Sequence, residues 1–342
     1  MIANKSALLT GVKLSTACAL AFILYTAFHW PYGYWSVVSV AAVTRPGLSF
    51  TLNKAMMRIV GTVIGAMLGY LIGWIATGNV IVVMCFFFMG IIVSSYVALQ
   101  KSLMSYCGII FGLTLTLVLA SGLMTNQLFG MAVYRTIEVI VGIACILVVN
   151  SLLRLFFPRK EALKAPFIRE FRLAWKKLLE FKNNKPLFFT AVRIAVAASL
   201  TFLPWVIFRY PGGYWATISC FFIMEESTMR VQEKGWMRFI SHVIVAVIGV
   251  VIAFIVGNHL WYLLFPILII YFALGYLMVS HSTFSTSCNT MGIALAIMLL
   301  ANPGLASTLG VILSRFLNVI GGIGVGILIS TYFFPSLVST GQ

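Results

Sequence analysis

The sequence FHWPYGYW, residues 28–35, returns as FRYPGGYW at residues 208–215, an offset of 180 residues. Both octets begin with Phe, carry proline at the fourth position and end in Gly-Tyr-Trp. Proline breaks a helix into a turn, and Trp and Tyr are enriched where a membrane meets water. We therefore interpret each octet as a turn at a membrane surface.

The same offset matches residues far from the octets. The matched pairs are Lys13 with Arg193, Arg58 with Arg238, Arg135 with Arg315, Gly69 with Gly249, and Gly142 with Gly322. Cations are rare inside apolar segments, so three matched pairs of them are a strong sign of common origin. The offset predicts an internal duplication.

The composition is that of a membrane protein. Of 342 residues, 61% are hydrophobic and 9% are charged, whereas soluble domains carry about 25% charged residues. The mean hydropathy is +1.05. Apolar runs of about 20 residues, enough to cross a hydrocarbon core, recur along the chain. We interpret the first run as a retained helix and not as a cleaved signal, because residues 188–208 repeat it.

These runs predict an all-α polytopic membrane protein with about 12 transmembrane helices. We expect two parallel six-helix modules, residues 1–157 and 187–342, joined by residues 158–186. The second helix of each module is short for a full span. The expected helices are 8–29, 33–44, 57–77, 79–98, 102–120 and 131–154, then 188–208, 213–224, 238–256, 260–280, 283–300 and 309–333.

Lys and Arg gather in alternate loops, which predicts that both termini face the cytoplasm. Six crossings per half give both modules the same orientation and place the octets at the outer surface. The protein is then a multi-pass protein of the cell inner membrane. The joining segment has nine Lys or Arg against three Glu, and Phe167, Phe171, Trp175 and Leu178 follow helical spacing. It predicts an amphipathic helix bound to anionic lipid, not a nucleic-acid site.

Enzyme chemistry has no support in the sequence. There is no Asp, and the seven Glu, four His and six Cys form no metal-ligand cluster, phosphate loop or nucleophile motif. We expect no catalytic residue, metal or cofactor.

The cations are the candidate site residues. Arg135 and Arg315 are expected about one turn inside the outer end of the last helix of each module, where burying a cation is costly. Glu138 is placed to pair with Arg135, whereas the counterpart of Arg315 has Asn318. Either these side chains reach the headgroups and form structural pairs, or they line a cavity and bind an anion.

Lys13 and Arg193 are expected near the cytoplasmic end, and Arg58 and Arg238 at the start of the third helix of each module. Each of the four has a structural or topological alternative, because charges near helix ends reach water easily. Taken together, three pairs of cations with almost no acid in the membrane favour a negatively charged solute.

Other side chains are candidates for the solute path or for coupling. Ser282, Ser285, Thr286 and Asn289 form a polar stripe, which either bonds neighbouring helices or lines the path. Aromatic residues expected at the outer mouth are Tyr34, Trp35, Tyr214 and Trp215. Candidates for proton coupling are Glu138, Glu225, Glu226 and His242, although solvated surface charge is the alternative for the last three. The glycines at 61, 65, 69 and 73 share a helix face for packing or for movement.

Two elements of the first half resemble the fusaric acid resistance and aromatic acid exporter family. They are YGYWSVVSVAAVTRPGLSFTLNKAMMRIVGTVIGAMLG (32–69) and RTIEVIVG (135–142). The second half keeps degenerate forms, with Ser241-His242 in place of Gly-Thr and Asn318 in place of Glu. The resemblance implies paired six-helix modules that export aromatic carboxylic acids or similar organic anions, and plant malate channels as distant relatives. Many members also have a large cytosolic domain, where this chain has the short joining segment.

We therefore predict an efflux transporter of organic, aromatic carboxylate anions that uses the cations to attract the solute. A passive organic-anion channel and a non-transporting component of an envelope assembly are the alternatives. The expected partners are a small organic anion, anionic lipid and either a second copy of the chain or a periplasmic adaptor protein.

Overall fold

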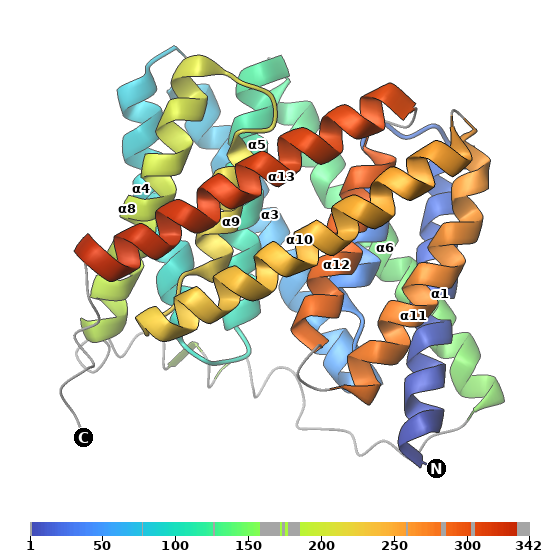
Figure 1. Ribbon diagram of the computed structural model, residues 1–342. Coiled ribbons are helices and arrows are strands. Elements are labelled where there is room, and N and C mark those ends of the chain that lie inside the picture. Colours follow the sequence, from blue (N-terminus) through green and yellow to red (C-terminus); the bar gives the residue numbers. More distant parts are fainter. Residues whose placement is uncertain are drawn as a thin grey trace. The chain divides into compact units, whose positions relative to one another are not determined.

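The computed structural model describes residues 2–76, 78–125, 127–157, 172, 175, 176, 185–257, 259–281, 285–301 and 305–333. Over these residues the chain is helical and has no strand (Figure 1). The predicted amphipathic helix of residues 158–186 lies almost entirely outside them, as does Ser282. The helices are α1 (Ile2–Ala27), α2 (Tyr34–Val43), α3 (Leu48–Ile75), α4 (Val80–Leu99), α5 (Ser105–Thr125), α6 (Leu128–Phe156), α8 (Lys185–Phe208), α9 (Tyr214–Ile223), α10 (Thr228–Val256), η2 (Leu260–Leu263), α11 (Leu264–Ser280), α12 (Ser285–Leu300), α13 (Leu305–Leu328) and the π-turn η4 (Ile329–Phe333).

The chain is a multi-pass membrane protein. Nine segments of the described chain are long and apolar enough to cross a membrane. The shorter apolar helices are α2 and α9, with 10 residues each, and α12, with 16. At about 1.5 Å per residue, ten residues rise about 15 Å, half of a hydrocarbon core of roughly 30 Å. Of the twelve expected crossings, those of α2 and α9 are therefore not complete spans by themselves.

Six long helices begin earlier than the sequence predicts: α1, α3, α6, α8, α10 and α13. α3 begins at Leu48 and α10 at Thr228, so Arg58 and Arg238 lie in the third turn and do not begin these helices. α6 begins at Leu128 and α13 at Leu305, which puts Arg135 about two turns and Arg315 about three turns inside, not one. The added first residues of α3, α6, α10 and α13 contain no proline, so the helix continues through them.

The contacts divide the chain into two compact units. Unit 1 comprises Met1–Met56, Ile137–Lys164 and Ile240–Leu313, and unit 2 comprises Met57–Thr136, Ala165–Phe239 and Ser314–Gln342. These units are not the sequence halves 1–157 and 187–342, because each contains helices of both. That the chain arose by duplication, with residues 1–157 and 187–342 as the two copies, stays a prediction.

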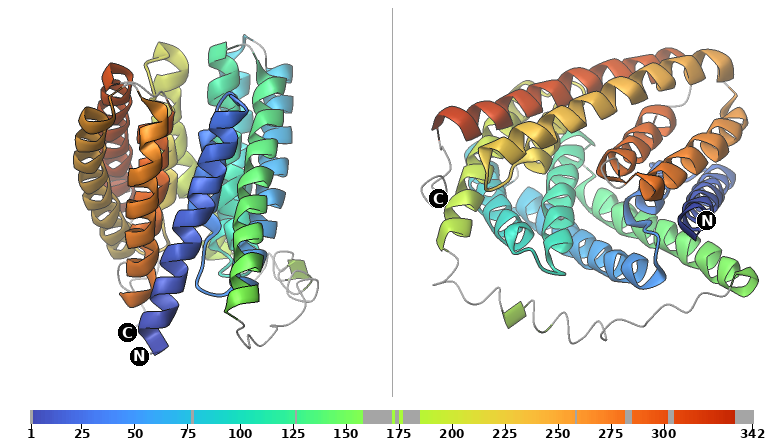
Figure 2. Two further views of the ribbon diagram at one scale, coloured as in Figure 1. Left: turned by 90° about the vertical axis from the view of Figure 1, so that its right-hand side faces the viewer. Right: turned by 60° about the horizontal axis from the view of Figure 1, so that its bottom comes forward.

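Within unit 1, α1 packs against α2 and α11, and α12 packs against α2 and α11. Figure 2 shows α1, in blue, beside α11, in orange. Within unit 2, α8 packs against α4 and α9, and α5 packs against α4 and α9. The same arrangement is thus built twice: the first two helices of one half pack against the fourth and fifth helices of the other.

Small residues allow α1 and α11 to pack closely. A Cβ atom on Gly275 of α11 would lie 2.8 Å from the Cα of Gly11 on α1, so the two helices touch backbone to backbone. In unit 2 the positions 180 residues away are Ala191 on α8 and Ser95 on α4, both fully buried. Small side chains of this kind let helices approach closely in lipid.

The row of glycines on α3 serves the same purpose in unit 2. Cβ atoms on Gly61 and Gly65 would each lie 2.6 Å from a carbonyl oxygen of α5, those of Cys107 and Phe111. This supports the packing interpretation of the row.

The two octets adopt the same turn. In the first, His29 and Tyr32 have positive φ angles of 49° and 62°; in the second, Arg209 and Gly212 have 51° and 70°. One backbone hydrogen bond is also repeated. Gly33 N–H donates to the Trp30 carbonyl at 3.1 Å, and Gly213 N–H donates to the Tyr210 carbonyl at 3.3 Å. Each turn leads directly into the short helix of its unit, α2 or α9.

Candidate functional site

The end of α2 in unit 1 is surrounded by basic side chains. The Lys13 ammonium of α1, which is buried, donates to the carbonyl of Arg45. Lys54 Nζ donates to the Ala42 carbonyl at 2.6 Å, and an Arg45 guanidinium nitrogen to the Thr44 carbonyl at 3.0 Å. Helix C-termini carry partial negative charge, which stabilises cations there.

The end of α9 in unit 2 repeats part of this arrangement. The buried guanidinium of Arg193 on α8 donates to the carbonyl of Glu225, and to that of Glu226 at 3.2 Å. Residues 13 and 193, like 45 and 225, are 180 positions apart. The cation of the first helix therefore holds the end of the short helix in both units.

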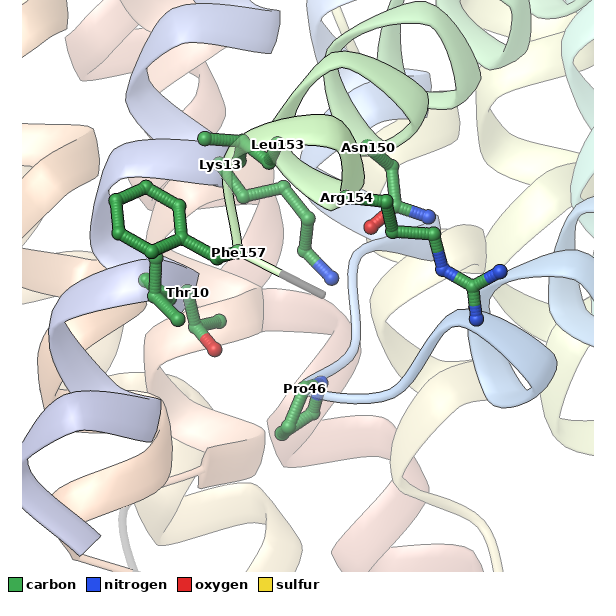
Figure 3. Close-up of a pocket in the computed structure, with 8 residues that line it drawn as sticks. Thr10, Lys13, Pro46, Asn150, Leu153, Arg154 and Phe157 are labelled. Atoms are coloured by element: carbon green, nitrogen blue, oxygen red, sulfur yellow. The ribbon is translucent and has the colours of Figure 1, made fainter. Parts of the chain in front are cut away.

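A pocket of about 40 Å³ adjoins Lys13 in unit 1. Figure 3 shows the Lys13 side chain of α1 extending toward Asn150 and Arg154 of α6. Asn150 is 8% exposed, and its side-chain Nδ2 has no hydrogen-bond partner among the described residues. The described lining residues include no acid: they are Leu9, Thr10, Lys13, Pro46, Asn150, Leu153, Arg154 and Phe157.

This pocket has the chemistry of a small anion site. An ammonium group, a guanidinium group and an amide with a free donor are suited to a carboxylate, and charge-assisted hydrogen bonds are the strong ones. A cavity needs about 10–15 Å³ to hold one water molecule, so 40 Å³ has room for a carboxylate group. The rest of a larger acid would have to lie outside the pocket or open it further.

Lys13 was a candidate from the sequence, whereas Asn150 and Arg154 were not. A single amide in the apolar run before Ser151 is the signal that marks Asn150. Its proximity to Lys13 depends on where α6 lies relative to α1 within unit 1, which has no signature in the sequence.

In unit 2, Arg315 of α13 lies against the second octet. The residue is 2% exposed, and its guanidinium Cζ lies 3.7 Å from the centroid of the Trp215 ring. The Ser314 hydroxyl and the Asn318 amide both donate to the Pro211 carbonyl, at 2.8 and 3.3 Å. Arg315 thus packs on the Trp215 ring, and its neighbours on α13 hydrogen-bond to the turn of the second octet.

The remaining cation pair also has neutral neighbours in unit 2. Arg58 donates to the Tyr106 hydroxyl at 3.2 Å. Arg238 approaches the Ser219 hydroxyl at 3.4 Å and lies over the Phe222 ring, with Cζ 5.0 Å from its centroid. Hydroxyls and rings stabilise a guanidinium without cancelling its charge.

Arg135 and Glu138 of α6 are both buried, at 5% and 2% exposure. Their spacing of three residues puts them on one helix face, and the predicted ion pair between them stays a prediction.

The other predicted residues are placed as follows. The rings of Tyr34 and Trp35 are 5.6 Å apart and those of Tyr214 and Trp215 are 5.2 Å apart, at the beginning of α2 and of α9. Both Trp rings are buried and do not stand open at a surface. Ser285 and Asn289 of α12 are half-buried, and neither lines the pocket beside Lys13.

The predicted coupling residues do not form one cluster. Glu225 forms an ion pair with Lys234, and Glu226 with Lys101 at 3.2 Å, all in unit 2. His242, in unit 1, is 1% exposed and lies fourteen residues after the start of α10, whereas in the predicted helix 238–256 it lies about one turn inside. The earlier start of α10 is the reason for this difference.

The buried charges of the described residues are unequal in sign. Five cations are buried, and the one buried carboxylate is that of Glu138. The cations are Lys13, Arg58, Arg135, Arg193 and Arg315.

Comparisons with known proteins agree with this picture. The family model described as "Fusaric acid resistance protein-like" matches residues 20–149 and 194–329, which is most of the chain. A curated relative, "Aluminum-activated malate transporter 10" of Arabidopsis thaliana, is 28% identical over 122 residues, covering 33% of this chain and 24% of the relative. The chain thus matches about a quarter of that protein's length. No solved structure matches the chain.

Proposed function

Because the chain belongs to the fusaric acid resistance protein-like family, we propose that it is a transporter that moves small organic anions across a membrane. The finer parts of the proposal are export from the cytoplasm, aromatic carboxylates as substrates and the cell inner membrane as location. The duplication into residues 1–157 and 187–342, cytoplasmic termini and a lipid-bound segment 158–186 belong to the same proposal.

The excess of buried cations is the observation that carries it. Five buried basic side chains against one buried carboxylate leave a net positive interior in the described residues. By insertion scales, a charged side chain at membrane depth costs about 2.5–3.5 kcal/mol, so such residues are rare there and mark functional sites. A positive interior attracts an anionic solute and repels a cationic one.

The pocket beside Lys13 supports a specific role in this transport. Lys13, Asn150 and Arg154 line a space with room for a carboxylate group and supply an ammonium, an amide and a guanidinium. By the distribution of Lys and Arg in the loops, this end of α1 and α6 faces the cytoplasm. We place the first binding step of an exported carboxylate here.

Proteoliposomes test the function. Purified protein is reconstituted, and benzoate uptake is followed with and without an imposed pH gradient. Uphill accumulation driven by the gradient indicates a coupled carrier, and steady unitary currents with a linear anion flux indicate a channel. No benzoate flux under either condition would exclude both readings.

Variants test the pocket. Lys13→Gln and Asn150→Leu are expected to lower the initial rate at least tenfold, about 1.4 kcal/mol in transition-state terms. Lys5→Gln removes the same charge from an exposed position of α1 and should leave the rate unchanged. Equal rates for Lys13→Gln and Lys5→Gln would remove the pocket from the transport path.

A further inference from the structure

The connection after the short helix has opposite charge in the two units. Residues 45 and 46 are Arg and Pro in unit 1, and the positions 180 residues later are Glu225 and Glu226 in unit 2. The backbone is held in the same way, since Lys13 donates to the residue-45 carbonyl and Arg193 to the residue-225 carbonyl. The two connections therefore differ in the charge of these side chains and not in how the backbone is held.

A lysine nine residues after this position, Lys54 in unit 1 and Lys234 in unit 2, has a different partner in each unit. In unit 1, Lys54 donates to the Ala42 carbonyl at 2.6 Å, a neutral acceptor. In unit 2, Lys234 forms an ion pair with the Glu225 carboxylate. The side chains of Lys234 and Glu225 are 42% and 22% exposed, so solvent weakens this pair and the carboxylate is exchangeable.

Glu225 and Lys234 also line a cavity of about 60 Å³ within unit 2. Apolar walls are supplied by Ile109, Phe221 and Phe222. Ser95 lies at the same cavity; its hydroxyl oxygen is fully buried and has no hydrogen-bond partner among the described residues. A cavity with an ammonium, an unused hydroxyl and aromatic walls has the components of a carboxylate site.

We propose that unit 2 contains a second site for a small apolar carboxylate, formed by Lys234 and Ser95, and that the Glu225 carboxylate occupies it in the resting protein. The solute's carboxylate takes the place of Glu225 on the Lys234 ammonium, its apolar part meets Phe221 and Phe222, and Ser95 donates a hydrogen bond. The cavity holds the carboxylate group, and displacement of the Glu225 side chain supplies the remaining room. This inference rests on the proposed function for its solute class.

The Glu225 carboxylate makes the site in unit 2 behave differently from the pocket in unit 1. A tethered carboxylate neutralises the lysine when no solute is present, and competes with a solute at a high local concentration. The site in unit 2 is therefore weak until Glu225 leaves, whereas the pocket in unit 1, with no acid among its described lining residues, is open to an anion at once.

Binding stoichiometry tests the proposal on the full-length protein in detergent, with radiolabelled benzoate as the probe. The wild type is expected to bind one benzoate per chain, and Glu225→Gln two, with the added site lost again in the double variant with Lys234→Gln. Glu233→Gln makes the same charge change at an exposed position of α10, next to Lys234, and should bind one. Glu225→Ala makes the same prediction and serves if Glu225→Gln does not purify as a single species.

The outcomes separate this inference from the proposed function. One benzoate in both the wild type and the Glu225 variants, lost in Lys13→Gln, overturns the second site and leaves the pocket in unit 1 in place. No benzoate in the wild type and one in Glu225→Gln supports the second site and contradicts the pocket beside Lys13. An equal gain in Glu233→Gln would show that general charge, not the tethered carboxylate, controls binding.

Discussion

The guanidinium of Arg315 lies over the indole ring of Trp215, with 3.7 Å between Cζ and the ring centroid. Trp215 is the last residue of the second octet, and Arg315 lies in the third turn of α13. A cation over an aromatic face is stabilised by about 0.5–2 kcal/mol, more when water is excluded. The repeated octet therefore does more than turn the chain: in unit 2 it supplies the ring that accommodates a buried cation.

We expect Arg315→Gln to abolish benzoate transport if this cation attracts the solute as proposed, because the change removes the positive charge while the amide keeps a polar group in place. Arg315→Lys should retain part of the rate. Trp215→Phe should retain more than Trp215→Leu, since a phenyl ring still faces the cation. The measurement is initial uptake in proteoliposomes, with size-exclusion chromatography to show that each variant is folded. Wild-type uptake by folded Arg315→Gln would remove this residue from the mechanism.

Close helix crossings predict a stability effect at two matched glycines. A Cβ on Gly142 of α6 would lie 2.3 Å from the Ser36 carbonyl oxygen, and one on Gly322 of α13 would lie 2.0 Å from that of Ala216. Alanine at either position forces the helices apart, and we expect a loss of about 1–3 kcal/mol in the free energy of unfolding.

The neighbouring Gly321 provides the control for this experiment. A Cβ there meets nothing within 4 Å, so Gly321→Ala should be neutral or slightly stabilising. Thermal unfolding followed by fluorescence compares the three variants. Equal midpoints for Gly321→Ala and Gly322→Ala would mean that α13 does not approach α9 so closely.

Each unit contains helices from both halves of the sequence, which predicts that neither half folds alone. α1 packs against α11, with Gly11 against Gly275, so the first half without the second leaves this surface uncovered. When residues 1–171 and 172–342 are expressed together as separate chains, we expect them to purify as a complex. Each fragment alone should aggregate or be degraded, and a stable, monomeric single fragment would contradict the packing.

Side-specific labelling tests the orientation. In a Cys85→Ser background, which removes the exposed native cysteine, Lys101→Cys and His281→Cys are expected to react with a membrane-impermeant maleimide from the cytoplasmic side. Gln127→Cys, at the opposite end of α5 from Lys101, should react from the outside. The remaining described cysteines are buried and should stay unlabelled. Labelling of residues 101 and 281 from opposite sides would refute parallel modules.

Local properties of the sequence were sufficient for several features of the molecule. The length of the apolar runs predicts the membrane class and the positions of most helices, because crossing lipid requires a fixed length of apolar chain. The octets predict two like turns, and their φ angles agree at positions 29 and 209 and at 32 and 212. Helix starts were less predictable, since Arg58 and Arg315 lie deeper than expected where polar residues extend α3 and α13.

By itself, then, the sequence determined a helical membrane protein of this family, with its octets and matched cations, because apolar length, proline turns and charge are properties of neighbouring residues. Only the tertiary structure decided that α1 packs against α11, that Asn150 and Arg154 join Lys13 at one pocket, and that Arg315 lies on Trp215. Which helices meet depends on the fit of whole surfaces, such as Gly11 against Gly275, and residues far apart in the chain carry no local mark of that fit.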